Sequence, residues 1–116
     1  MDMHVLLKEA ERMKETITAD RRTLHRNPEV GPDLPETVAY VKRRREEMGY
    51  APQELAGGIT ADITGADTGR CILLRADMDA LRIREETGLE FQSEIGNMHA
   101  CGHDCHAAML LGAARL

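Results

Sequence analysis

Hydrophobic residues recur with a helical period along the first part of the chain. Between about residues 4 and 26 they lie three, four or seven positions apart, a spacing that puts them on one face of a helix. These residues are Val5, Leu6, Ala10, Met13, Ile17 and Leu24. Asp2 and Asp20 are both candidates to cap or interrupt this helix, and the sequence does not choose between them. Pro28 disfavours helical geometry at Asn27, which predicts that the helix ends near residue 26.

A second helix is predicted from Leu34 to Met48. Asp33 is a suitable N-cap, and Glu36, three residues later, completes a pair that resembles a capping box. Gly49 lies where a glycine is expected just beyond the end of a helix. Arg45 interrupts the apolar face of this predicted helix.

Beyond residue 50 the helical period gives way to patterns that are typical of strands. Residues 59–63 alternate between apolar and polar side chains and include β-branched ones, which predicts a strand. The continuous apolar run at residues 71–74 predicts a second strand that is buried on both faces. A helix rich in small residues is predicted at residues 107–114, and small side chains permit its close approach to a sheet. Helices, then strands, then a helix predict an α/β fold.

The composition of the chain argues against several classes of function. Its 116 residues suffice for one domain, and the formal net charge of -5 argues against a nucleic-acid partner. No apolar stretch reaches the roughly 18–20 residues that a membrane helix needs, so no membrane partner is expected. The three cysteines, an odd number, do not suggest a disulfide framework. A reducing, cytoplasmic location is the simplest interpretation.

The segment from Met98 to His106 holds the densest set of metal-binding side chains. Its nine residues include three histidines, two cysteines and one aspartate, and thiolate and imidazole groups are preferred ligands of zinc and similar metals. Cys101 and His103 can reach one ion from a tight loop, and Asp104 can orient an imidazole. The segment is also compatible with a structural zinc site, or with a loop that binds no metal.

Two aspartates form a second candidate site. Asp77 and Asp79 follow the apolar run, at the carboxyl end of the predicted strand, where open α/β sheets bind ligands. Because residues two apart on a strand point to the same side, either carboxylate can hold a metal-bound histidine or serve in catalysis. A helix N-cap beside an exposed acid is the alternative interpretation.

Four segments of the chain together resemble the M20 metallopeptidase superfamily. They are residues 22–31 (RTLHRNPEVG), 74–81 (LRADMDAL), 85–89 (EETGL) and 98–106 (MHACGHDCH). The subgroup that they resemble contains hippurate hydrolases, N-acyl-amino-acid amidohydrolases and auxin-conjugate hydrolases. The resemblance implies that residues 1–116 are the amino-terminal portion of a zinc-peptidase-like, three-layer α/β/α catalytic domain, without the inserted lid domain used for dimerisation.

The resemblance also implies roles for individual residues. Cys101 and His103 match metal ligands, and Asp79 matches a catalytic aspartate that orients a ligand. His99 is expected to be structural. Three further residues are expected to support the metal ligands without binding the ion themselves: Asp77, Asp104 and His106.

The activity that the resemblance implies is metal-dependent hydrolysis of the amide bond of N-acyl amino acids or short peptides. One or two divalent ions, zinc or manganese, polarise the carbonyl and lower the pKa of a bound water toward about 7, while a glutamate takes the proton. In the family that glutamate and the remaining ligands lie further along the chain than residue 116, so this chain is expected to be inactive alone. Family members are often homo-oligomers. Two alternative hypotheses are a pseudoenzyme fragment and a non-enzymatic metal-binding module with ligands from His99, Cys105 or His106.

Overall fold

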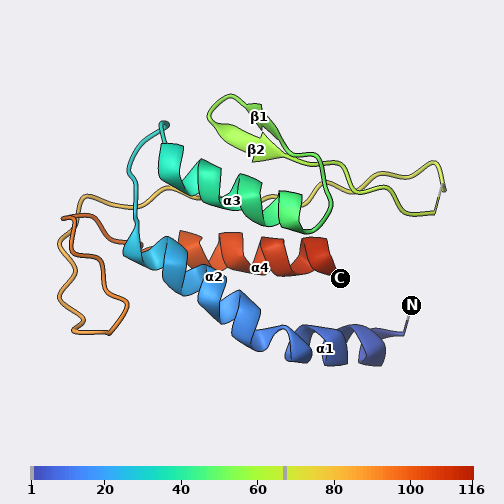
Figure 1. The fold of residues 1–116 in the computed structure, drawn as a ribbon, viewed down its shortest axis with the longest axis horizontal. Coiled ribbons are helices and arrows are strands. Elements are labelled where there is room, and N and C mark those ends of the chain that lie inside the picture. The colour runs from blue at the N-terminus through green and yellow to red at the C-terminus, as the bar shows by residue number, and fades with distance from the viewer. Residues whose placement is uncertain (1, 67) are drawn as a thin grey trace.

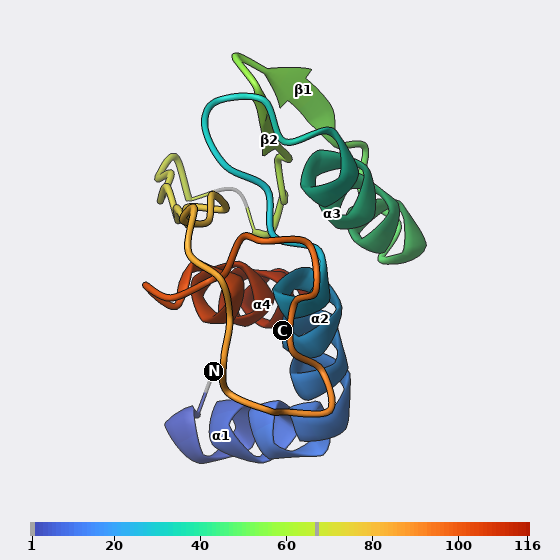
Figure 2. The same ribbon diagram turned by 90° about the vertical axis from the view of Figure 1, so that its left-hand side faces the viewer.

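Four helices and one short β-hairpin make up the regular structure of the described residues, 2–66 and 68–116, in a computed structural model of the chain. In chain order the elements are α1 (Met3–Arg12), α2 (Lys14–Arg26), α3 (Pro35–Glu47), β1 (Gln53–Leu55), β2 (Gly58–Thr60) and α4 (His103–Arg115). The helices come first, then the strands, then a helix, as the sequence predicts (Figure 1). The hairpin lies beyond α3, on the opposite side of the molecule from α1 (Figure 2).

The first predicted helix is in fact two helices, because the chain bends at Met13. This residue has φ -88° and ψ 1°, and its N–H donates to Ala10 in a tightened last turn of α1. The Asp2 side chain caps α1 by accepting a hydrogen bond from the backbone N–H of His4 at 2.9 Å. Asp20 does not cap a helix. It is buried in the middle of α2, where it accepts hydrogen bonds from α3.

The predicted Asp33 cap of α3 is wrong. The helix begins at Pro35, after Leu34, whose side chain cannot accept a hydrogen bond. Glu29 performs the capping instead, since its carboxylate accepts the backbone N–H of Thr37 at 2.6 Å and a second first-turn N–H at 3.2 Å. A glutamate in the preceding loop has the reach to satisfy these donors, and its charge suits the positive end of the helix.

The predicted glycine at the end of α3 is confirmed. Gly49 has φ +87°, and its N–H donates to Glu46, while the N–H of Tyr50 donates to Arg45. These two bonds form a Schellman motif, which satisfies the last carbonyl groups of the helix. Arg45, which interrupts the predicted apolar face of this helix, is buried, and this burial lowers the pKa of its guanidinium.

Only part of the predicted strand structure is present in the described residues. Of the strand predicted at residues 59–63, only Ile59 and Thr60 belong to a strand, β2, and residues 61–63 lie outside it. β2 pairs antiparallel with β1 through a turn at Ala56 and Gly57, both with positive φ. The predicted buried strand at residues 71–74 is wrong for this structure. The side chains of Ile72 and Leu73 are 84% and 88% exposed, since no described segment pairs with this stretch to form a sheet around it.

The core forms where α4 packs against α2 and α3 (Figure 1). Its buried centre consists of Leu24, Val41, Ala107 and Leu111. The small residues predicted for this helix do permit close approach: a Cβ placed on Gly112 would lie 2.8 Å from the side chain of Ile17 in α2. The helix begins four residues earlier than predicted, at His103, so it includes part of the histidine-rich segment. In the described part of the chain, no helix combines the length and apolar character needed to cross a bilayer.

Candidate metal centre

Backbone hydrogen bonds bring the distant motif segments together at the amino-terminal end of α4. The N–H of Ala80 donates to the carbonyl of Glu29 at 2.8 Å, which joins the 77–81 segment to the loop after α2. Leu81 and Met98 exchange two backbone hydrogen bonds of 3.0 and 2.9 Å in an isolated antiparallel bridge. Asp77 and Asp79 therefore lie beside His103 and His106, in the first turn of α4.

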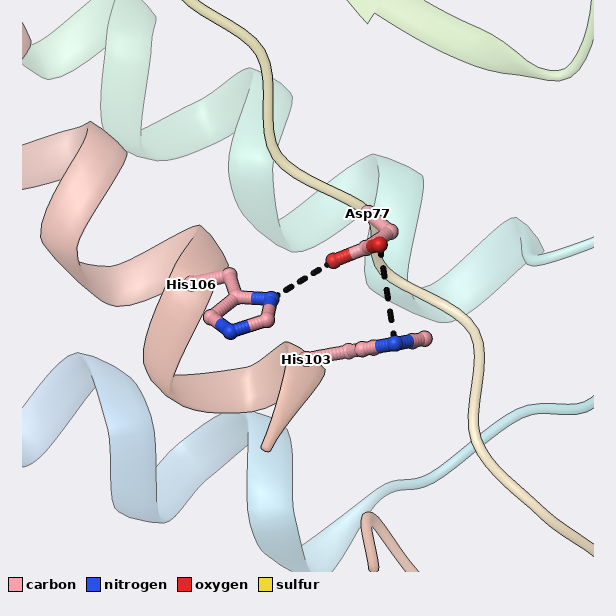
Figure 3. A group of neighbouring side chains, drawn as sticks. All are labelled: Asp77, His103 and His106. Atoms are coloured by element: carbon pink, nitrogen blue, oxygen red, sulfur yellow. Dashed lines mark hydrogen bonds and ion pairs between the residues drawn. The ribbon is translucent and has the colours of Figure 1, made fainter. Parts of the chain in front are cut away.

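Asp77, His103 and His106 form one group of possible metal ligands, whose ligand atoms all lie within 4.8 Å of one another (Figure 3). His106 Nδ1 lies 2.8 Å from one carboxylate oxygen of Asp77, and His103 Nε2 lies 3.5 Å from the other. The two imidazoles are three residues apart on α4, so they project from the same face of the helix. His106 is exposed and the other two are half-buried, which leaves the group open to solvent on one side.

The hydrogen bond from His106 lowers the pKa of the Asp77 carboxyl below its ordinary value, and the nearby charges of the two imidazoles act in the same direction. Asp77 is therefore an ionised carboxylate that faces two imidazole rings. A carboxylate and two imidazoles constitute a donor set typical of catalytic zinc sites, which use three protein ligands and leave one position open.

Asp79 determines which nitrogen of His103 carries a proton. The Nδ1 atom of His103 lies 3.0 Å from the Asp79 carboxylate and 2.8 Å from its backbone carbonyl. Both groups are acceptors, so Nδ1 donates. In the neutral imidazole this leaves the lone pair on Nε2, the atom that faces Asp77. This arrangement orients the ring as a partner behind a metal ligand does.

The other predicted site residues lie apart from this group. Cys101 is exposed and is not among the ligand atoms that the described residues bring together. Gly102, with φ +85°, turns the backbone between Cys101 and His103, so the cysteine precedes the helix that the histidine begins. Asp104 is fully buried and turns inward, where it pairs with α2. His99, expected to be structural, is 4% exposed, and its burial lowers the pKa of its ring.

Two residues that sequence reasoning did not single out complete the surroundings of α4. His25 bonds to Asp104 through Nδ1 and to Glu85 through Nε2, each at 2.8 Å. Both residues lie within segments that carry the family resemblance, residues 22–31 and 85–89. That resemblance was the available signal, but a pairing across 60 and 79 positions of sequence is not visible in local patterns.

Comparison with known proteins identifies one family model and several similar proteins. The family model described as peptidase family M20/M25/M40 matches residues 73–116. N-acetyl-L-cysteine deacetylase of Bacillus subtilis is 47% identical over 90% of this chain and 26% of its own length. N-acyl-L-amino acid amidohydrolase of Geobacillus stearothermophilus is 40% identical over 90% of this chain and 29% of its own length.

A solved structure agrees with these sequence relatives. The YXEP protein of Bacillus subtilis, described as a dinuclear metal binding peptidase from the M20 family, matches with a TM-score of 0.85 and 38% identity. The match covers 90% of this chain and 30% of that one. The chain thus spans less than a third of the length of each of these three proteins.

Proposed function

Because this chain belongs to the M20 peptidase family, we propose that it supplies part of a divalent metal site for hydrolysis of the amide bond of N-acyl amino acids. The observation that carries this proposal is the group of Asp77, His103 and His106, with Asp79 holding the first imidazole in place. The names of the relatives support the substrate class, since they describe a deacetylase of N-acetyl-L-cysteine and an amidohydrolase of N-acyl amino acids.

The residues of this group fit zinc or manganese. Imidazole nitrogen suits zinc, and carboxylate oxygen suits manganese. Asp77 and the two histidines would hold the ion, so Asp77 and His106, which the resemblance assigns to support the ligands, are proposed here as ligands themselves. Asp79 keeps the proton of His103 on Nδ1 so that Nε2 can bind. A bound ion supplies polarisation of the amide carbonyl and a bound water of lowered pKa. Cys101 is proposed as a further ligand on the family resemblance alone, and the relative of known structure, a dinuclear protein, supports a second ion.

We propose in addition that the 116-residue chain does not catalyse hydrolysis by itself. A general base must lie within hydrogen-bonding reach of the water that it deprotonates. Of the two carboxylates at this site, Asp77 would be occupied by the ion that it holds, and Asp79 accepts a hydrogen bond from His103. Neither is then free to deprotonate a water, so metal binding without turnover is expected.

A zinc titration tests the metal site. Zinc and manganese affinities are measured by competition with a chromophoric chelator for the unaltered chain and for His103→Gln and Asp77→Asn. The matched control is His4→Gln, which changes an exposed histidine on α1. Loss of a direct ligand is expected to weaken binding at least tenfold, because even residues that only support ligands cost about 10–100-fold. Equal affinities for His103→Gln and His4→Gln would overturn the proposed site.

Two further measurements separate the finer claims. Cys101→Ala is expected to weaken zinc binding if the thiolate is a ligand, and unchanged affinity removes Cys101 from the set. Hydrolysis of N-acetyl amino acids is followed with the metal-loaded chain. An enzyme-like rate that disappears with chelator would contradict the proposed inactivity of the isolated chain while supporting the metal site.

We propose that the protein acts in a reducing compartment such as the cytoplasm. All three cysteines are free thiols, and Cys71 and Cys101 are exposed to solvent. Exposed thiols are vulnerable to oxidation where no thiol reductant is present. Alkylation of the protein inside cells, followed by mass spectrometry, is expected to find these cysteines reduced.

A further inference from the structure

A buried chain of ion pairs joins α2, the loop at residues 85–93 and the first turn of α4. The Asp104 carboxylate, whose side chain is 0% exposed, accepts hydrogen bonds from Arg21 Nε and His25 Nδ1, each at 2.8 Å. The His25 ring is 2% exposed, and its Nε2 lies 2.8 Å from the Glu85 carboxylate, which is also fully buried. The four side chains lie in the order Arg21, Asp104, His25, Glu85.

One imidazole ring joins two buried carboxyl groups in this chain. Both ring nitrogens of His25 face carboxyl oxygens, Nδ1 that of Asp104 and Nε2 that of Glu85. Burial opposes ionisation of Glu85, but hydrogen bonds from the Ser93 N–H, from His25 and from a threonine hydroxyl outweigh it and lower the pKa of Glu85.

This network acts on the part of α4 that carries the proposed metal ligands. The helix begins after Gly102, which has no side chain to cap it. Asp104 lies between His103 and His106 in the sequence. Successive residues of a helix are about 100° apart around its axis, so Asp104 points into the protein while the two histidines face Asp77. Holding the Asp104 side chain therefore fixes the rotation of the first turn about the helix axis.

We propose that His25 and Glu85 are positioning residues that act through Asp104 to aim the imidazoles of His103 and His106 at Asp77. The claim concerns the aim of the two rings, and its consequence for metal affinity rests on the proposed metal site. A rigid partner is needed behind a metal ligand, because loss of such residues typically weakens metal binding about 10–100-fold. The His25 ring is itself held in place, since Phe91 contacts it edge-on with ring centroids 5.5 Å apart.

The test compares two networks of similar burial. His25→Gln and Glu85→Gln each replace one member of the chain described above, in which the two side chains are hydrogen-bonded to each other. The control, Asp20→Asn, weakens a different buried network, in which Asp20 accepts from the Tyr40 hydroxyl at 2.6 Å and from Arg44 at 2.8 Å and joins α2 to α3. Thermal unfolding of all three variants measures the general cost in stability.

Two readouts report the aim of the rings in the 116-residue chain. Zinc affinity, measured by chelator competition, is expected to fall about 10–100-fold in His25→Gln and Glu85→Gln and to stay unchanged in Asp20→Asn. Correlation spectra of the histidine ring nitrogens in metal-free protein show whether Nδ1 of His103 still carries the proton that it donates to Asp79. This signature is expected to weaken in the two network variants and to persist in the control.

Each outcome decides the proposal. Unchanged ring spectra and zinc affinity in a folded His25→Gln variant overturn it, and so does an equal loss in Asp20→Asn, which would reveal a general effect of stability. If His25→Gln does not fold, Glu85→Gln decides in its place, because the glutamine keeps an acceptor for the Ser93 N–H. If the unaltered chain binds no zinc, the metal site fails, and the ring spectra alone still decide the positioning role.

Discussion

Replacement of Asp104 by asparagine is the most informative change to the stability of this protein. In the described structure one carboxylate oxygen, Oδ2, accepts both hydrogen bonds, while Oδ1 is buried with no partner. Asparagine has nearly the same shape, and its carbonyl oxygen can take the place of Oδ2. The substitution therefore removes the negative charge, leaves both hydrogen bonds in place as weaker ones, and puts an amide NH2 without a partner where Oδ1 was.

The expected cost follows from the burial of the two donors. A hydrogen bond with a charged partner contributes about 1.5–3 kcal/mol, roughly twice a neutral one, so each bond loses about 1 kcal/mol or somewhat more. The Arg21 side chain is 30% exposed and can turn to water, whereas His25, at 2%, cannot. Discounting the Arg21 bond for this exposure and adding the burial of the unpartnered amide, we expect Asp104→Asn to destabilise the chain by at least about 2 kcal/mol.

Urea unfolding followed by far-ultraviolet circular dichroism measures this cost. For a chain of this size the slope is about 1–2 kcal/mol per molar urea, so the midpoint is expected to fall by roughly 1 M with no change in slope. Arg21→Met is the control and is expected to cost less than Asp104→Asn, since the Arg21 side chain is 30% exposed and Asp104 keeps its hydrogen bond with His25. A loss below about 0.5 kcal/mol in Asp104→Asn would refute the ionised carboxylate, and an equal loss in Arg21→Met would refute the assignment of His25 as the dominant partner.

Three further predictions concern other parts of the molecule. Gly57→Ala is expected to destabilise more than Gly49→Ala by urea unfolding, because both have positive φ but only at Gly57 would the new Cβ meet a backbone carbonyl at 2.7 Å. The pKa of Glu85 is lowered in the folded state. Its contribution to the free energy of unfolding is therefore complete above its ordinary pKa near 4.5 and is lost as the pH falls below this value. Glu85→Gln is expected to flatten the fall in unfolding free energy between about pH 5 and 3. Serine at both Ile72 and Leu73, which are 84% and 88% exposed, is expected to change stability by less than about 0.5 kcal/mol and to reduce self-association in analytical ultracentrifugation.

The helices were largely predictable because their signals are local. The end of α3 at Gly49 follows from one residue type that adopts positive φ without cost, and the apolar period of α4 follows from its own residues. The bend at Met13 was not predictable, because the apolar period continues through it. The capping of α3 was missed for a related reason: Glu29 lies seven and eight residues before the N–H groups that it accepts, outside the span of a local capping motif.

The predicted strand at residues 71–74 shows the limit of a pattern read without its neighbours. A continuous apolar run predicts burial on both faces, but burial requires other strands beside it and layers above and below. In the described part of this chain those partners are not in place, and Ile72 and Leu73 face solvent. The pattern of residues indicates which environment suits a segment. Whether the segment is buried depends on the other segments that pack around it.

The sequence by itself determined which residues have side chains that can bind a metal, because side-chain type, the spacing of histidines on one helix and the polar residues after an apolar run are all local properties. Only the tertiary structure decided which of them meet. It placed Asp77 rather than Cys101 beside His103, and it paired His25 with Asp104 across 79 positions of the chain. The physical reason is that contacts between distant segments depend on the path of the intervening loop and on the packing of α4, which the local pattern of residues does not encode.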